Sequence, residues 1–328
     1  MARYLDQMNG SMEPLNALWR LEAEQATPRQ ELSAEEAPAV FQEVVQVLSG
    51  TPSAEQLRKA QLDLVAACRA ELPEACTYMR EQLKRPKRLS GATPSLTRSA
   101  FEKKAVAAVV IGARLGTNGR PRDFTVVESA PFGMTEEVIK ALSTFIYEPA
   151  KLAGHPIEIP YTFTFRIFHP EVSLSKEQEL QWARTRVSQF PASSAAWDNL
   201  ARILARDAPE DPWYGKALDS LNRLSPQYWW SATELAWLRA EEGRYAEAEP
   251  LAKVGRRSAP ENPYVLETAA RVAFHRGRCR EAIEEQQLAV TKLPEAWPEE
   301  ERARFKQALE VYQRGCSSAS APAVPSNG

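Results

Sequence analysis

The chain lacks the residue patterns that identify most enzymes. It contains three histidines, and none of them stands in a metal-ligand spacing such as HExxH. A phosphate-binding loop, a GxSxG motif and a paired Cys/His nucleophile are also missing. We therefore expect no catalytic residues, no metal and no cofactor, and a protein that is not an enzyme.

An excess of one charge and long apolar runs are missing too. Lys and Arg number 41 and Asp and Glu number 43, which gives a net charge of −2. Nucleic-acid binders usually carry a strong basic excess, so we expect no nucleic-acid partner. No run approaches the roughly 18 apolar residues of a membrane span. No export signal is visible at the N-terminus, which leaves a cytoplasmic protein or an export segment outside this sequence.

Cysteine is scarce, with four residues in the chain. Cys68 ends one expected helix and Cys76 begins the next, so a helical hairpin would bring them together. Cys279 starts a helix that the terminal helix follows back over a similar length, which returns Cys316 to the level of Cys279. We predict these two disulfides, and they favour the periplasm or another part of the cell envelope. The alternative is four free thiols in a reducing cytoplasm.

Capping residues mark several helix starts. Ser33 with Glu36, and Ser53 with Gln56, each fit a capping box ahead of a run with helical apolar spacing. Thr135 is expected to cap a later helix. The first 88 residues are therefore expected to be helical.

Residues 84–95 have the composition of a linker. They contain a basic run made by Lys84, Arg85, Lys87 and Arg88. We expect this run to be solvated. The alternative is contact with an anionic lipid or a cell-wall polymer.

The middle of the chain has the pattern of a small sheet with one helix. Strands are expected at 105–115 and 122–129, joined at Asn118-Gly119, because both residues tolerate the positive φ of a tight hairpin. A helix and a last strand at 157–168 follow. The expected order is β-β-α-β, with one sheet face covered by the helix.

The last strand is also a candidate binding site. It is expected to lie at the sheet edge, where a strand can accept an extended peptide by main-chain pairing. Pro160 removes one donor and would instead guard the edge. The apolar face of this strand carries Ile157, Ile159, Tyr161, Phe163 and Phe165.

The C-terminal half repeats with a period of 34 residues. Residues 234–260 align without a gap onto 268–294, which pairs Gly243 with Gly277. A looser copy precedes them and begins near Trp197. A lone terminal helix and a polar tail end the chain.

This repeat resembles the tetratricopeptide repeat, which has the same period, small residues within its helices and glycine at the turn. In that family the first helix of each pair lines a concave binding surface. The resemblance implies that the residues facing this surface include Trp230, Glu234, Trp237, Glu241, Tyr264, Glu267, Arg271 and His275. Trp237 and Arg271 hold the same position in consecutive repeats, so stacking would place them close together. The alternative for each tryptophan is a place in the repeat core.

Residues 92–170 resemble the C-terminal domain of TonB-type proteins. The match rests on "VVESAPFG" and on "FIYEPAKLAGHPIEIPYTFTFRI", where that family has an aromatic–Glu-Pro-Ala sequence, a Gly-Pro turn and the last strand. Proteins of the family bind receptor segments at a sheet edge and transmit force from a membrane-anchored helix through a Pro-rich spacer. This sequence has neither helix nor spacer, so the resemblance implies the fold and not energy transduction.

Together these patterns predict a multidomain, mostly α protein of the α+β class. The expected parts are a helical segment (1–88), a TonB-C-like domain (89–171), a tetratricopeptide-like solenoid with a capping helix (172–316) and a disordered tail (317–328). The leading function is an adaptor of the bacterial cell envelope that binds a protein or peptide, such as an outer-membrane component. One alternative is a cytoplasmic scaffold in which the small α+β domain is a spacer. Another is an enzyme subunit whose helical array serves for docking.

Overall fold

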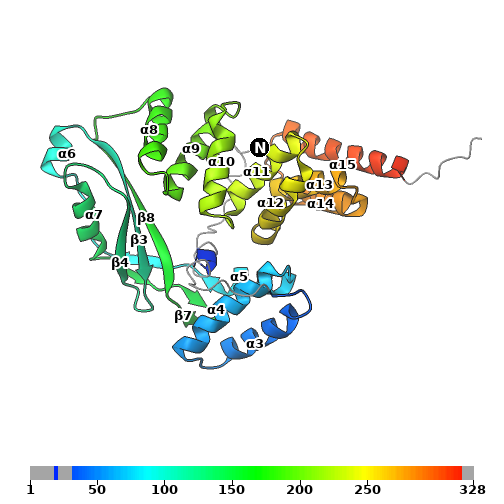
Figure 1. Ribbon diagram of the computed structural model, residues 1–328, viewed down its shortest axis with the longest axis horizontal. Coiled ribbons are helices and arrows are strands. Elements are labelled where there is room, and N and C mark those ends of the chain that lie inside the picture. The colour runs from blue at the N-terminus through cyan, green and yellow to red at the C-terminus, as the bar shows by residue number, and fades with distance from the viewer. Residues whose placement is uncertain (1–17, 21–31, 320–328) are drawn as a thin grey trace, which may run out of the picture. The chain divides into compact units, whose positions relative to one another are not determined.

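The computed structural model describes residues 18–20 and 32–319. These residues form a mostly helical α+β protein, as the sequence predicts (Figure 1). They divide into two compact units, one that ends at Ser220 and one that starts at Leu221. Within the described ranges, no helix combines the length and the apolar character needed to cross a membrane.

Helices α3 (Ala37–Ser49), α4 (Ala54–Arg69) and α5 (Pro73–Gln82) open the first unit. The capping box predicted for α4 is present, because the Ser53 hydroxyl accepts from the Gln56 N–H and the Gln56 side chain accepts from the Ser53 N–H. Reciprocal hydrogen bonds of the same kind precede α3. Proline begins α5, where its missing N–H costs no helical hydrogen bond.

A three-stranded antiparallel sheet follows, in the order β4-β3-β8. It is built from β3 (Val106–Leu115), β4 (Pro121–Glu128) and β8 (Ile159–Phe168), with α7 (Met134–Leu142) between β4 and β8 in the chain. β8 pairs with β3 along its whole length and lies at one edge, while α7 packs on β3 and β4. The order of the elements matches the strand and helix pattern of the sequence.

The segment expected to be a linker is partly strand. β1 (Leu83–Lys84) pairs with β6 (Lys151–Leu152), which also pairs with β7 (His155–Pro156). β2 (Lys87–Ser90) pairs with β5 (Ile146–Glu148). The linker prediction is therefore wrong for this stretch, because its partners are strands about sixty residues further along the chain that composition alone does not reveal.

One hydrophobic core joins the N-terminal helices to the sheet. Leu64 and Met79 of the helices are buried in the same cluster as Val109 and Ile111 of β3 and Phe145 after α7. The helices therefore bury apolar side chains against the sheet as well as against one another.

Two local predictions are wrong in detail. Thr135 lies inside α7 and not at its N-cap, and its hydroxyl accepts from the N–H of Ala130 on the preceding loop at 2.8 Å. In the hairpin turn Gly119, and not Asn118, has a positive φ, of 72°. The turn folds against β5, where the Gly119 carbonyl accepts from the N–H of Tyr147 at 2.8 Å.

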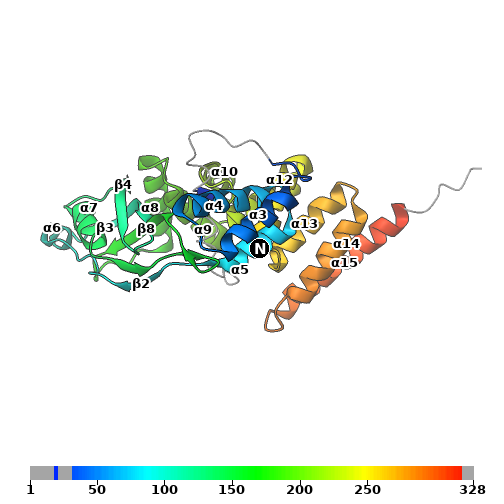
Figure 2. The same cartoon turned by 90° about the horizontal axis from the view of Figure 1, so that it is seen from below.

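Residues 176–319 form a series of helices joined by short connections. These helices are α8 (Lys176–Gln189), α9 (Ser194–Asp207), α10 (Trp213–Leu224), α11 (Trp229–Glu241), α12 (Tyr245–Ser258), α13 (Pro263–His275), α14 (Cys279–Lys292) and α15 (Glu299–Ala319). Each bound of α13 and α14 lies 34 residues after the matching bound of α11 and α12, as from Trp229 to Pro263. The sequence repeat is thus a repeat of helix pairs, and Figure 2 shows α15 lying beside α14.

The last helix extends beyond its expected end. α15 runs to Ala319, into the segment 317–328 that was expected to be a disordered tail. The remainder of that segment, and residues 1–17 and 21–31 of the predicted helical segment, lie outside the described residues.

A buried ion pair fastens β4 to the helices that follow it. The Glu128 carboxylate accepts two hydrogen bonds from the Arg186 guanidinium of α8, both at 2.9 Å, and one from the Ser193 hydroxyl at 2.5 Å. Arg186 also donates to the side-chain oxygen of Asn199 on α9 at 2.6 Å. The side chains of the two ions are 0% and 5% exposed, so each charge depends on the other for its stabilisation.

Candidate partner-binding site

Trp237, Glu241 and Arg271 come together on α11 and α13. The guanidinium carbon of Arg271 lies 4.4 Å from the centroid of the Trp237 ring, which is a cation–π distance. Glu241 Oε1 accepts a hydrogen bond from the Trp237 indole at 2.9 Å and lies 3.8 Å from an Arg271 nitrogen. Trp237 and Arg271 are half-buried and Glu241 is exposed. The cluster therefore offers an aromatic face, a cation and a carboxylate at one accessible place.

A second stacked pair lies on the next turn of α13. The rings of His275 and Tyr245 are 4.2 Å apart and inclined by 8°. Burial, and then the charge of Arg271, lower the pKa of His275. Because its ordinary pKa is about 6.5, the imidazole is neutral at pH 7. We call Trp237, Glu241, Tyr245, Arg271 and His275 the α11–α13 cluster.

Sequence reasoning missed Tyr245. It begins α12, just after Gly243, whose φ of 75° reverses the chain between α11 and α12. This reversal returns the start of α12 to the end of α11 and so to the candidate site. The signal in the sequence is the glycine at the turn, which places the residue two positions later beside the end of the preceding helix.

Four of the predicted contact residues are buried. The exposed fractions are 0% for Trp230, 4% for Glu234, 0% for Tyr264 and 1% for Glu267. Their side chains are packing residues of the helical array. The expectation that they line an open surface does not hold for them.

The reason for two of these burials is α15, which packs on α13. The Tyr264 ring meets the ring of Phe305 at 5.3 Å, and its hydroxyl donates to Glu301 at 3.1 Å. The Glu267 carboxylate pairs with the Arg304 guanidinium at 2.6 and 2.9 Å. Burial raises the pKa of Glu267, and the hydrogen bonds from Arg304 oppose that rise.

Further along α15, Tyr312 and Cys316 continue this packing. The Tyr312 ring lies 4.7 Å from that of Phe274 on α13, and burial raises the pKa of its hydroxyl to about 12. α15 thus contacts α13 from Tyr264 to Phe274, while His275 stays exposed.

The five apolar residues predicted for the edge strand do not form an open surface. Ile157, Ile159 and Phe163 are buried in the core, and Tyr161 and Phe165 pack against it. Among the described residues, no strand pairs with β8 on the side away from β3. A partner at this edge would therefore meet main-chain groups.

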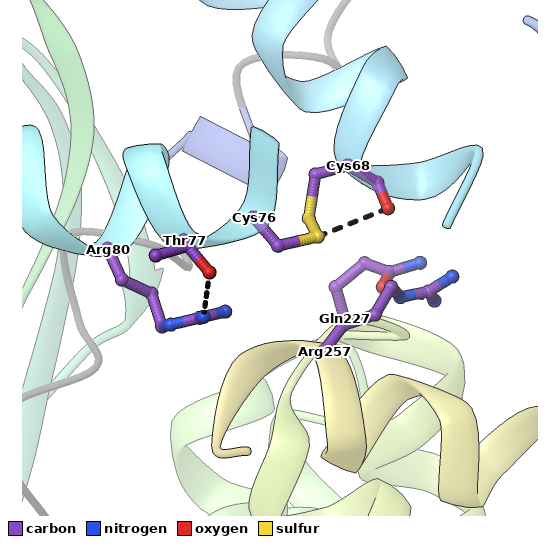
Figure 3. Close-up of a disulfide and its surroundings, with 6 residues drawn as sticks. All are labelled: Cys68, Cys76, Thr77, Arg80, Gln227 and Arg257. Carbon is purple, nitrogen blue, oxygen red and sulfur yellow. Dashed lines mark hydrogen bonds between the residues drawn. A yellow bond between two sulfur atoms is a disulfide. The ribbon is translucent and has the colours of Figure 1, made fainter. Parts of the chain in front are cut away.

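Both predicted disulfides are present. Cys68 at the end of α4 is bonded to Cys76 near the start of α5, with 4.7 Å between their Cα atoms (Figure 3). Cys279 at the start of α14 is bonded to Cys316 of α15, with a Cα separation of 5.6 Å. All four cysteines of the sequence are thus paired, which points to an oxidising compartment other than the cytoplasm.

No group of three or more His, Cys, Asp or Glu side chains suited to a metal ion occurs in the part of the chain that the structure describes. Comparison of the sequence with protein families and with curated proteins gave no match.

Proposed function

We propose that the protein is a non-enzymatic adaptor that binds a protein or peptide partner through the α11–α13 cluster. The observation that carries the proposal is the contact of Trp237 with Arg271, two residues 34 positions apart that stand at equivalent places in consecutive helix pairs. Aromatic and arginine side chains supply much of the binding energy at protein interfaces. A half-buried pair of this kind can hold an acidic or aromatic side chain of a ligand.

The helix pairs support a tetratricopeptide-like array as the scaffold for this site. Their period, the glycines at their turns and the covering helix α15 are the features such arrays use. We also propose that residues 89–171 form a TonB-C-like domain, preceded by the helical segment 1–88. The β4-β3-β8 sheet with α7 on it supports this assignment.

We place the adaptor in the periplasm of a bacterial envelope. Two disulfides favour an oxidising compartment, and they weigh against the alternative of a cytoplasmic scaffold with the small α+β domain as a spacer. The edge of β8 is proposed as a second contact for an envelope or outer-membrane partner.

A site-specific crosslink tests the main site. A photoreactive amino acid at Ala246, an exposed residue next to Tyr245, should capture a partner in the native host. The capture should disappear when Trp237 and Arg271 are both replaced by Ala. The matched position is Gln287, which is exposed on α14. Capture from Gln287 and none from Ala246 would contradict the proposal.

Affinity and stability of the double variant separate binding from folding. With a captured partner peptide, Trp237→Ala with Arg271→Ala should weaken binding by more than about 1 kcal/mol. Its melting temperature should stay close to that of the wild type, because neither side chain is fully buried. A large loss of stability would instead assign Trp237 to the core.

Hydrogen exchange tests the edge strand. The amides of β8 that point away from β3 should be protected when the partner peptide adds as a strand. Unchanged exchange over residues 157–168 at saturating peptide would remove the edge from the binding site.

A further inference from the structure

The basic run that begins at Lys84 forms an exposed surface made of cations and one leucine. Lys84, Arg85 and Lys87 are exposed, and Leu89 is 61% exposed. Among the described residues, Leu89 is the most exposed large apolar side chain. The run therefore combines a cluster of cations with one apolar side chain in water.

The backbone explains why Leu89 is exposed. The pairing of β2 with β5 shifts register between Arg88 and Ser90, so Leu89 sits in a bulge, and bulges re-aim side chains. Arg88 lies on the opposite side, with its guanidinium carbon 3.8 Å from the centroid of the buried Phe145 ring. Arg88 thus anchors the strand on the core, while Lys87 and Leu89 face away from it.

The carboxylate opposite Lys87 does not form an ion pair with it. Glu148 stands opposite Lys87 in the strand register, but its ion pair is with Lys151 at 2.8 Å. That hydrogen bond is the main cause of the lowered pKa of Glu148, and Lys87 contributes least. Lys87 therefore stays available to an anionic surface, beside the exposed Lys84 and Arg85.

We propose that Lys84, Arg85, Lys87 and Leu89 dock the protein on the surface of a bilayer that contains anionic phospholipid. The cations contact the headgroups and Leu89 enters the boundary between headgroups and acyl chains. This proposal is independent of the α11–α13 cluster, and it gives an adaptor a way to stay at a membrane by surface contact.

Other occupants fit the same features less well. A stable protein interface buries on the order of 1,000 Å² with an apolar centre, whereas this surface has one exposed leucine. Strand addition to β2 is opposed by its bulge and by Lys87, because bulges and lysines protect free sheet edges. An anionic polymer would use the cations but has no use for Leu89.

Vesicle co-sedimentation of the full, oxidised chain tests the proposal. The protein should bind vesicles that mix phosphatidylglycerol with phosphatidylcholine, and this binding should weaken as salt rises. It should bind pure phosphatidylcholine weakly. Each cation near an anionic surface contributes about fivefold to partitioning, so Lys84→Gln with Arg85→Gln and Lys87→Gln should lower binding by more than about tenfold. Leu89→Ser should lower it at every salt concentration.

The chain offers a matched control on α6 (Arg98–Glu102) and the turn after it. Arg98→Gln with Lys103→Gln and Lys104→Gln removes the same charge from exposed positions and should leave vesicle binding within about twofold of the wild type. An equal loss in both triple variants would mean a net-charge effect and overturn the proposal. So would wild-type protein that ignores anionic vesicles but is retained on an anionic polysaccharide. Circular dichroism spectra that match the wild type confirm that the variants fold.

Discussion

At the scale of single residues, the repeat register predicted which side chains would meet but not which would stay accessible. Trp237 and Arg271 are in contact because a 34-residue offset fixes their relative positions on stacked helix pairs. Tyr264 and Glu267 obey the same register and are buried, because Phe305 and Arg304 of α15 cover them. Their partners belong to a helix outside the repeat, so the period carries no information about them.

The buried pair of Glu128 and Arg186 escaped sequence reasoning for a similar reason, since 58 residues separate them. Removing one partner leaves an uncompensated charge in the interior. We expect Glu128→Ala to lower the free energy of unfolding by about 3–5 kcal/mol, measured by urea denaturation. Replacing both ions, as Glu128→Met with Arg186→Met, should restore much of this loss.

The exposed pair of Arg122 and Glu158, with a 2.6 Å contact, supplies the control. Glu158→Ala should cost less than about 1 kcal/mol, because water screens and solvates both ions. Similar losses for Glu128→Ala and Glu158→Ala would show that burial does not set the strength of the pair on β4.

At the scale of elements, helices and strands could be predicted where the signal is local. The capping boxes before α3 and α4 and the alternating apolar residues of β8 are such signals. The short strands β1 and β2 could not be predicted, because their only strand-like feature is pairing with β5 and β6 far along the chain. Hydrogen bonds to these distant strands turn a segment with the composition of a linker into β-strand.

The hairpin turn gives a test of one such long-range contact. A Cβ on Gly119 would lie 1.8 Å from the carbonyl oxygen of Tyr147, and its φ is 72°. Gly119→Ala should therefore displace the turn from β5 and cost more than about 3 kcal/mol, since backbone strain and a lost contact add.

Gly154→Ala is the matched variant. Its φ is 86°, but a Cβ there would meet nothing within 4 Å, so it should cost only about 1–2 kcal/mol of left-handed strain. Thermal denaturation compares the two, and amide exchange of Tyr147 should rise in Gly119→Ala alone. Equal costs would mean that the turn does not depend on β5.

At the scale of the whole molecule, both disulfides could be predicted from where the cysteines lie on neighbouring helices. Cys68 and Cys76 flank the turn between α4 and α5. Cys279 starts α14 and Cys316 lies near the end of α15, so an antiparallel pair of these helices brings the two thiols together, although α14 has 14 residues and α15 has 21. The shared core of the N-terminal helices and the sheet could not be read in this way, because apolar periodicity shows which face is buried but not against what.

The length of the closed loop sets how much each disulfide contributes to the free energy of unfolding. The two pairs close loops of 37 and 8 residues. Cys279→Ser with Cys316→Ser should lower the free energy of unfolding by roughly 4 kcal/mol, and Cys68→Ser with Cys76→Ser by roughly 2–3 kcal/mol. Guanidinium denaturation of oxidised protein measures both. Mass spectrometry of unreduced protein from its native host provides the check on compartment, where four free thiols would contradict the bridges and the periplasmic assignment.

The bridge from Cys279 to Cys316 also changes how the chain responds to tension. A residue adds at most about 3.3–3.6 Å to an extended chain, so the sequence separation of 37 between the two cysteines corresponds to a contour length of roughly 130 Å. While the disulfide is closed, a force applied between the chain ends passes directly from Cys316 to Cys279, and the segment between them does not extend. α14 and the part of α15 before Cys316 then lie outside the line of force and can stay folded while the rest of the chain is stretched. Reduction would release the hidden length and let α14 and α15 extend under the same pull.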